Sequence, residues 1–399
     1  MGKAILSLRE HQKRAQRGDT DNHFTEGVIK AVEAIVKRLG SFEAIESFKE
    51  FRAFAYKNYQ RLGEATPGSA FGQLFRAGVQ ISTNGWYERT EVEYEKYTMM
   101  DTTNKRQEFW APLWGSQFPS EVSEGEPYAE TTVLGQDIEF IPRKFMGGES
   151  FTREMFDDDQ TGQIKQRMQK LGESARLREE LEMAGRLSNV ALTYGNATVG
   201  KSLYARKNNV GATVGAFDTS FYGTRAGVNY GNRLSSFAQL SMQGIRSGLS
   251  ALKRAFDPLG IPLAVRPDVL VASPEDDINA RTLMNSSLYP GVQGRGGETM
   301  NTAASGFAVG LSADNMLKGM LDLAGNVFLP PWAWNIGCKG KGLMFVRRDP
   351  LEVVQEVPNS GKSFDSDVIR FRSRSRYRGD WNDAMFWFQG NDGSVAGTQ

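Results

Sequence analysis

One segment of the chain has the residue types and spacing of a phosphate-binding loop. Gly195 to Ser202, GNATVGKS, matches the pattern G-x-x-x-x-G-K-[ST], in which backbone amides cradle phosphates, the lysine (Lys201) reaches the terminal ones and the serine holds magnesium. Such a loop needs a long helix whose N-terminus faces the phosphates. The residues that follow, LYARKNNVGATVGAF, allow about one helical turn before glycines intervene. We therefore predict a glycine-rich turn here, and a nucleotide hydrolase stays the alternative.

Histidine and cysteine are too few for the commoner catalytic and metal sites. The single cysteine, Cys338, excludes an internal disulfide and a cysteine-based zinc site, and the two histidines, His11 and His23, both lie in a basic N-terminal stretch. The acidic run 157–159 could bind a metal, but its carboxylates also suit the start of a helix, and no histidine or further acidic cluster is near in sequence. We predict no catalytic residue, no metal, no cofactor and no enzymatic activity.

The composition is that of an ordinary globular protein. Hydrophobic residues make up 40% and charged residues 24%, and the net charge is +1, so no overall attraction to DNA is indicated. No run approaches the ~18 apolar residues of a membrane helix. The first residues lack the apolar core of a signal peptide. We expect a protein that has no membrane partner and that is made and kept in a cytoplasm until a later event.

Three stretches have helical patterns that set the frame of the molecule. Residues 24–39 carry an amphipathic stripe, and residues 41–62 form a second predicted helix. Within 150–189 the spacing predicts a helix of ~30 residues, about 45 Å long, which suits a spine across an extended subunit. The stripe of the first helix consists of Val28, Val32, Ile35, Val36 and Leu39.

Shorter helices and strands are predicted before and after the long helix within 150–189. From Val92 to about Phe140 the pattern is strand-like, with a turn-rich acidic piece at 115–130, and it forms a long two-stranded excursion with little apolar surface. Ser273 is expected to cap a helix that follows a buried strand. A further helix is predicted near Ala313–Leu323, followed by a strand at Val327–Leu329.

A strand near the C-terminus has five arginines on one face. In SDVIRFRSRSRYRGD, arginine alternates with smaller or apolar residues, and a period of two places all arginines on the same side. Like charges crowded on one face are destabilising, so the row demands an anionic partner. The arginines are Arg370, Arg372, Arg374, Arg376 and Arg378.

The order of these segments resembles the major capsid proteins of tailed bacteriophages with the Hong Kong 97 fold, and is most similar to Mu-type head subunits. The stretch EFWAPLWGSQFPSEVSEGEPYAETTVLGQDIEF looks like the extended loop of that family, and PLAVRPDVLVASPED looks like the central strand and helix of its axial domain. The start of the spine helix resembles the family's S-R-E-L-hydrophobic-D-D pattern. The matching residues are Ser150, Arg153, Glu154, Met155, Asp157 and Asp158.

The resemblance implies an α+β Hong Kong 97-like capsid fold with an N-terminal arm, an extended β loop, a peripheral domain with a long spine helix, and an axial domain. The implied divisions are a helical arm at 1–84, an arm-to-loop connection at 85–107, the extended loop at 108–146, the peripheral domain with the spine helix at 147–193, the axial domain at 194–361, closing strands of the peripheral domain at 362–391 and a tail at 392–399.

The resemblance also implies a mechanical function. Copies of the chain would form hexamers and pentamers that close by symmetry into an icosahedral shell around double-stranded DNA, which they contact non-specifically. Portal, scaffold and decoration proteins are the other implied partners, and the implied location is the virion capsid, with the host cytoplasm during assembly. A nanocompartment shell of the encapsulin type, which has the same fold, is the nearest alternative.

Two opposite charge patterns suggest where neighbouring subunits meet. The loop carries Glu121, Glu124, Glu126 and Glu130, and in the family this loop reaches over the peripheral domain of the adjacent subunit. We predict that some of these glutamates pair with arginines between Arg370 and Arg378 across a subunit boundary. The alternatives are that the arginines are satisfied by acids of their own subunit, or face packaged DNA, while the loop is solvated.

Overall fold

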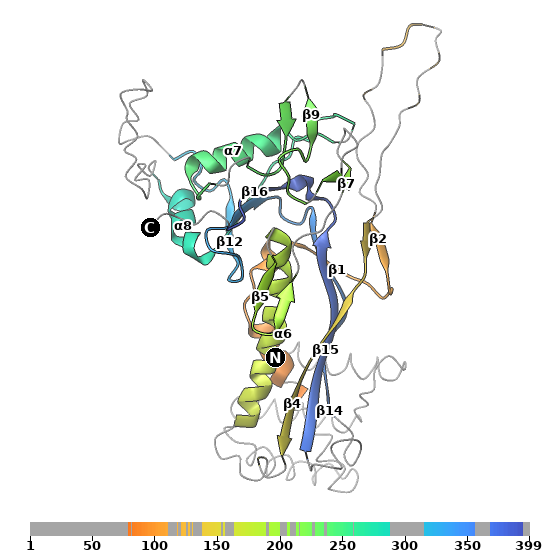
Figure 1. The fold of residues 1–399 in the computed structure, drawn as a ribbon, viewed down its shortest axis with the longest axis vertical. Helices are drawn as coiled ribbons and strands as arrows, with labels where there is room; N and C mark the ends of the chain where they lie inside the picture. Colours follow the sequence, from red (N-terminus) through yellow and green to blue (C-terminus); the bar gives the residue numbers. More distant parts are fainter. Residues whose placement is uncertain are drawn as a thin grey trace. The chain divides into compact units, whose positions relative to one another are not determined.

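The computed structural model of the chain describes most residues from 79 to 393 (Figure 1). The exceptions within that range are 81, 111–117, 119–120, 125–126, 128–129, 131–137, 153–154, 156–162, 189–190, 200–205, 208–212, 215, 226–227, 235–237, 258, 288–314 and 356–367. The predicted helices at 24–39 and 41–62, both histidines and the acidic run 157–159 lie outside the described residues. The chain divides into two compact units. The first holds residues up to Glu91, Arg143–Arg178 and Arg348–Tyr377, and the second holds Val92–Pro142, Glu179–Arg347 and the residues from Arg378 on.

The long helix expected between 150 and 189 is α6 (Gln163–Leu187), with 25 residues. In the first unit its apolar residues Ile164, Met168 and Leu171 follow helical spacing and are buried. They pack with Phe151 and Phe371 from two strands of this unit. This packing stabilises the N-terminal half of α6, whereas the residues from Leu181 to Leu187 are buried on every side of the helix.

The arginine-rich segment forms the long strand β15 (Val368–Trp381), as its alternation predicts. It pairs antiparallel with β4 (Arg143–Thr152), from Val368 opposite Thr152 to Tyr377 opposite Arg143. The residues between the arginines, from Phe371 to Tyr377, are buried, and the arginines are exposed or half-buried. The sheet has the order β1-β14-β15-β4, with β1 at Met99–Thr102 and β14 at Leu343–Gln355.

A second four-stranded sheet forms the centre of the second unit, in the order β12-β11-β13-β16. The strands are β11 (Val269–Ala272), β12 (Asp322–Gly325), β13 (Trp334–Gly337) and β16 (Trp387–Asn391). Helix α7 (Met242–Lys253) packs on it, because Gly244 and Gly248 let the helix backbone approach the rings of Trp334 and Phe388. Ser241 caps α7 by accepting a hydrogen bond from the Gly244 amide at 3.1 Å.

Smaller elements complete the described part of the second unit. They are η2 (Tyr94–Lys96), the antiparallel pairs β2 (Glu108–Trp110) with β3 (Ile138–Phe140), β5 (Leu192–Tyr194) with β6 (Ala197–Val199), β7 (Arg206–Lys207) with β8 (Thr213–Val214) and β9 (Gly223–Arg225) with β10 (Val228–Tyr230), together with η3 (Pro274–Asp276), α8 (Asp277–Asn285) and η4 (Ala384–Phe386). The mixture of helices and sheets confirms the predicted α+β class. None of the helices in the described ranges is long and apolar enough to span a membrane.

Three local predictions in this unit have mixed outcomes. Ser273 occupies the N-cap position after the buried strand β11, as predicted, but its side chain makes no capping hydrogen bond and the helical segment begins as the 3-10 turn η3 before α8. The other two predictions are wrong. Of the helix predicted at Ala313–Leu323, the described residues 316–320 form turns in which Gly319 adopts a φ of +66°, and the last two residues belong to β12. The residues Val327–Leu329 form a turn, in which the Asn326 side chain accepts a hydrogen bond from the Phe328 amide at 3.0 Å.

Candidate assembly and anion-binding surfaces

The arginine row of β15 meets carboxylates of its own chain. Arg374 and Arg376 both lie near the Asp349 carboxylate on β14, at 3.7 and 3.5 Å. Arg378 binds the Asp380 carboxylate through two nitrogens, at 3.0 and 2.5 Å. All these side chains are partly exposed, so each ion pair contributes only ~0–1 kcal/mol.

The other two arginines of the row, Arg370 and Arg372, also take part in interactions within the chain. Carboxylates of the same chain therefore supply part of the negative charge that the row requires. This agrees with the alternative that acids of its own subunit satisfy the arginines. The Asp349 carboxylate is shared by two arginines, so one negative charge lies near two positive ones at this point of the row.

The acidic loop between β2 and β3 is exposed wherever the structure describes it. Glu121, Glu124 and Glu130 lie in the described part and are exposed, whereas Glu126 lies outside it. Among the described residues none of these three glutamates forms an ion pair. Phe118 is 72% exposed, so this segment presents a large apolar side chain that the interpretation of a loop with little apolar surface overlooked.

The base of this loop is anchored by a small apolar cluster. Phe140 of β3 is buried against Met344 and Val346 of β14, and Trp110 and Ile138 pack beside them. On β2, Phe109 precedes Trp110 and pairs with Glu139, so its side chain points away from the cluster, and it is 63% exposed. One face of the strand pair is thus fixed to the subunit, and the other is left uncovered in a single chain.

The motif Gly195–Ser202 does not form a phosphate-binding loop in its described part. β5 and β6 are antiparallel, with Tyr194 opposite Ala197, and the turn between them begins at Gly195 with a φ of +57°. A phosphate-binding loop would run from a strand into a helix. Lys201 and Ser202 lie outside the described residues. The predicted glycine-rich turn is confirmed as far as Val199, where it is a β-hairpin.

Acidic, histidine and cysteine side chains do not gather into a metal site in the part of the chain that the structure describes. Cys338 is buried and its thiol donates a hydrogen bond to the Arg266 carbonyl at 3.2 Å. Burial, and next the charge of Asp268, raises the pKa of this thiol to about 11. It is therefore a protonated packing residue at neutral pH and has no nucleophilic character.

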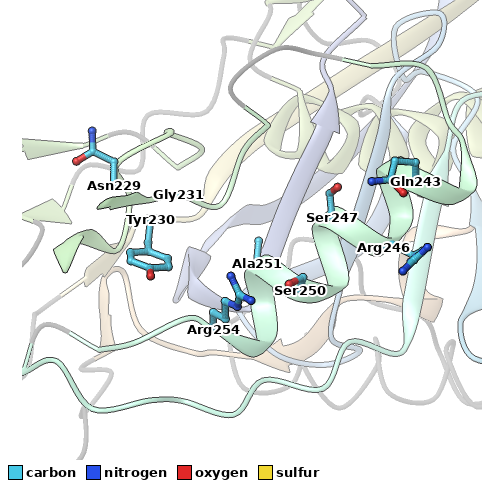
Figure 2. Close-up of a pocket in the computed structure, with 9 residues that line it drawn as sticks. All are labelled: Asn229, Tyr230, Gly231, Gln243, Arg246, Ser247, Ser250, Ala251 and Arg254. Atoms are coloured by element: carbon cyan, nitrogen blue, oxygen red, sulfur yellow. The ribbon is translucent and has the colours of Figure 1, made fainter. Parts of the chain in front are cut away.

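A groove that the sequence did not suggest lies beside α7. Figure 2 shows its lining, in which Arg246 lies on α7, Arg254 is the C-cap residue of that helix, and Asn229, Tyr230 and Gly231 lie at the end of β10 and just after it. Its volume is about 520 Å³. The two halves are separated in sequence and no local motif joins them, so sequence reasoning had no signal for this site.

The sequence model of a family described as phage capsid protein matches residues 137–388 of the chain. The match begins just before β3 and ends within β16, so it includes α6, both large sheets except β1, and the arginine row. No curated protein matches the chain by sequence.

Several solved structures share the general path of the chain at low identity. The capsid of a native GTA particle has a TM-score of 0.43 at 13% identity, over 77% of this chain and 89% of that one. The mature capsid of bacteriophage PhiM1 has a TM-score of 0.42 at 11% identity, over 75% and 86%. A virus-like particle from Pyrococcus furiosus has a TM-score of 0.43 at 9% identity, over 78% and 98%. Similarities of this size do not bear on function.

Proposed function

The chain belongs to the phage capsid protein family, and we propose that its copies assemble into hexamers and pentamers that close an icosahedral head around the double-stranded DNA of a tailed phage. The observation that carries this proposal is the family match over residues 137–388. The chain is thus a major capsid protein, a structural component of the virion. We further propose that it assembles in the host cytoplasm, with portal, scaffold and decoration proteins as partners.

The exposed apolar side chains support an assembling subunit. Phe118 is 72%, Ile278 79% and Met316 89% exposed in a single chain. In a closed shell with symmetric contacts, neighbouring copies would cover such side chains.

The proposal is tested by imaging the full-length chain after expression. Negative-stain electron microscopy is expected to show closed shells or hexameric rings. A compact monomer that stays dispersed under all assembly conditions would contradict the proposal. The divisions expected from the sequence, with the arm at 1–84, the extended loop at 108–146, the axial domain at 194–361 and the closing strands at 362–391, are part of this proposal.

We also propose that the loop glutamates pair with the arginine row across a subunit boundary. Glu121, Glu124 and Glu130 are exposed, and the Asp349 carboxylate is shared by Arg374 and Arg376. All five arginines of the row also interact within their own chain, and Arg372 is the most exposed of them. Bidentate arginine–carboxylate pairs would fix the register between subunits as well as attract.

A charge swap tests this pairing. Reversal of Glu121, Glu124, Glu126 and Glu130 to lysine is expected to block shell assembly. Combining it with Arg370→Glu and Arg372→Glu is expected to restore part of the yield, because opposite charges again face each other. The matched control combines the lysine loop with Arg281→Glu, which reverses an exposed arginine of α8. Equal rescue by the control, or defects that simply add, would show that the two patches never meet.

A further inference from the structure

The groove beside α7 is basic and polar. Its cations are Arg246 and Arg254, and among the described residues no acidic side chain lines it. Every polar side chain of the lining can donate a hydrogen bond. The remaining lining residues are Asn229, Tyr230, Gly231, Gln243, Ser247, Ser250 and Ala251.

The two arginines are exposed and are not neutralised by the described part of the chain. Both lie on the outer side of α7, whose opposite side is buried through Ile245, Leu249 and Leu252. No salt bridge among the described residues involves either of them. Arg254 is the C-cap residue of α7, eight residues after Arg246, which corresponds to a rise of about 12 Å along the helix axis. Two unpaired guanidinium groups at this spacing would attract a ligand with repeated negative charge.

The lining indicates which anionic ligand fits. Arginine, serine, asparagine, glutamine and tyrosine are the side chains that contact phosphate oxygens in protein–DNA interfaces. A groove for a protein segment would instead offer apolar or aromatic anchor pockets. Here the apolar side chains of the lining are limited to the Ala251 methyl group and the ring of Tyr230, which also carries a hydroxyl. The chemistry therefore favours a phosphodiester backbone over an acidic peptide.

We propose that the α7 groove binds one sugar–phosphate strand of packaged double-stranded DNA, with Arg246 and Arg254 each contacting a phosphate. The contact is independent of base sequence, because only backbone oxygens are read. The inference rests on the proposed function, in that a head subunit has nucleic acid as its cargo. It also reconciles a net charge of +1 with DNA contact, since the attraction is local rather than global.

The test is a titration of the unassembled full-length chain with a fluorescent 30-base-pair duplex at several NaCl concentrations. The double variant Arg246→Gln with Arg254→Gln is compared with the wild type. Each lost phosphate contact is expected to lower the slope of log K against log salt by about 1, and to weaken binding roughly five- to tenfold near 0.1 M salt. The matched control is Lys253→Gln with Arg281→Gln, which removes the same charge from exposed positions outside the groove. The control is expected to keep the wild-type slope.

Three results would overturn the inference. These are an unchanged slope in the double variant, an equal loss in the control, or displacement of the duplex from the wild type by an acidic peptide of sequence 118–130 at lower concentration than by unlabelled duplex. A second readout is the nuclease-protected nucleic acid in purified shells, which is expected to fall in the double variant and not in the control. Failure of the proposed function would give a different result, because neither the wild type nor any variant would then form shells.

Discussion

Glu179 is the centre of a buried polar network in the second unit. Its carboxylate is almost fully buried, and it accepts hydrogen bonds from the Tyr94 hydroxyl at 2.7 Å and from the Arg347 guanidinium at 3.0 Å. The neighbouring Glu180 accepts from the Tyr94 amide at 3.2 Å and thereby holds the 3-10 turn η2. Burial, and next the charge of Glu180, raises the pKa of Tyr97 well above its usual value, so this phenol stays protonated. The network ties η2 and β14 to the C-terminal half of α6.

Replacing Glu179 by alanine is expected to destabilise the chain by roughly 3–5 kcal/mol, because Arg347 would lose its buried carboxylate partner. Tyr94→Phe, which removes one hydroxyl and keeps the ring, is the comparison and is expected to cost about 1 kcal/mol. The measurement is urea denaturation of the unassembled chain. A cost of Glu179→Ala no larger than that of Tyr94→Phe would show that the carboxylate is not the centre of the network.

Cys338 is expected to be unreactive in the folded chain. Its pKa of about 11 leaves very little thiolate at pH 8, whereas an unfolded cysteine with a pKa of about 8.5 is partly ionised. Reaction with an aromatic disulfide reagent, followed by absorbance, should be at least a hundredfold faster in urea. Since the folded pKa is raised, the stability linked to the neutral thiol is complete below about pH 8.5 and is lost as the pH rises towards 11. Equal rates in native and denaturing buffer would contradict the burial of this thiol.

At the scale of elements, a glycine sets how closely two helical segments of the first unit approach. Gly172 lies in α6, and a Cβ there would be 2.2 Å from the Thr83 carbonyl oxygen in the helical segment 82–89. Gly85 lies in that same segment and has nothing within 4 Å of a Cβ position. The two glycines therefore differ in packing while both sit in helical backbone.

Opposite effects of alanine are expected at these two glycines. Gly85→Ala should stabilise the chain by ~0.5–1 kcal/mol, because alanine favours a helix over glycine. Gly172→Ala should gain the same helix propensity and yet lose ~1–3 kcal/mol overall, since the backbone of the neighbouring segment must shift. Thermal unfolding of the unassembled variants measures both. An increase in melting temperature for Gly172→Ala would show that the contact is soft.

The β5–β6 hairpin leads to a prediction about nucleotides. Because a turn at Gly195 joins two antiparallel strands, the amides of this segment are not arranged around a helix N-terminus. The chain is expected not to bind ATP with magnesium, as measured by calorimetric titration, and Lys201→Ala is expected to leave the titration flat. Tight magnesium-dependent binding that disappears in Lys201→Ala would reinstate the nucleotide hydrolase.

Some of these elements were predictable because their signal lies in adjacent residues. The alternation from Arg370 to Arg378 predicts β15, and the spacing of Ile164, Met168 and Leu171 predicts α6. The close approach of Gly172 to Thr83 joins residues far apart in the chain, and the groove beside α7 joins the segments 229–231 and 243–254, which no local motif links. At 313–323 the helical spacing is present, but the backbone at Gly319 overrides it.

At the scale of the whole molecule, the described part of the subunit leaves apolar side chains uncovered on several elements. Phe109 lies on β2, Ile278 on α8 and Met316 in the turn before β12. In a closed shell each copy uses several distinct surfaces, so neighbouring copies would cover side chains of this kind.

The N-terminal segment is expected to contribute to the same contacts. Its sequence predicts two amphipathic helices, whose apolar stripes need a partner that a thin arm cannot supply. Deletion of residues 1–64 is therefore expected to impair shell assembly by at least several-fold in particle yield. The circular dichroism of the remaining chain should keep the helix and strand signals of the described residues.

Point variants separate the apolar stripe from the mere length of the segment. Val32→Ser with Ile35→Ser changes the stripe, and Lys30→Ser with Lys37→Ser changes the opposite side of the same predicted helix. The stripe variant is expected to reproduce most of the assembly defect, because burial of each of these side chains contributes ~1.5–3 kcal/mol. The lysine variant is expected to assemble normally. Particle yield is measured by sedimentation and negative-stain microscopy, and normal shells from the truncated chain would show that the segment is dispensable for closure.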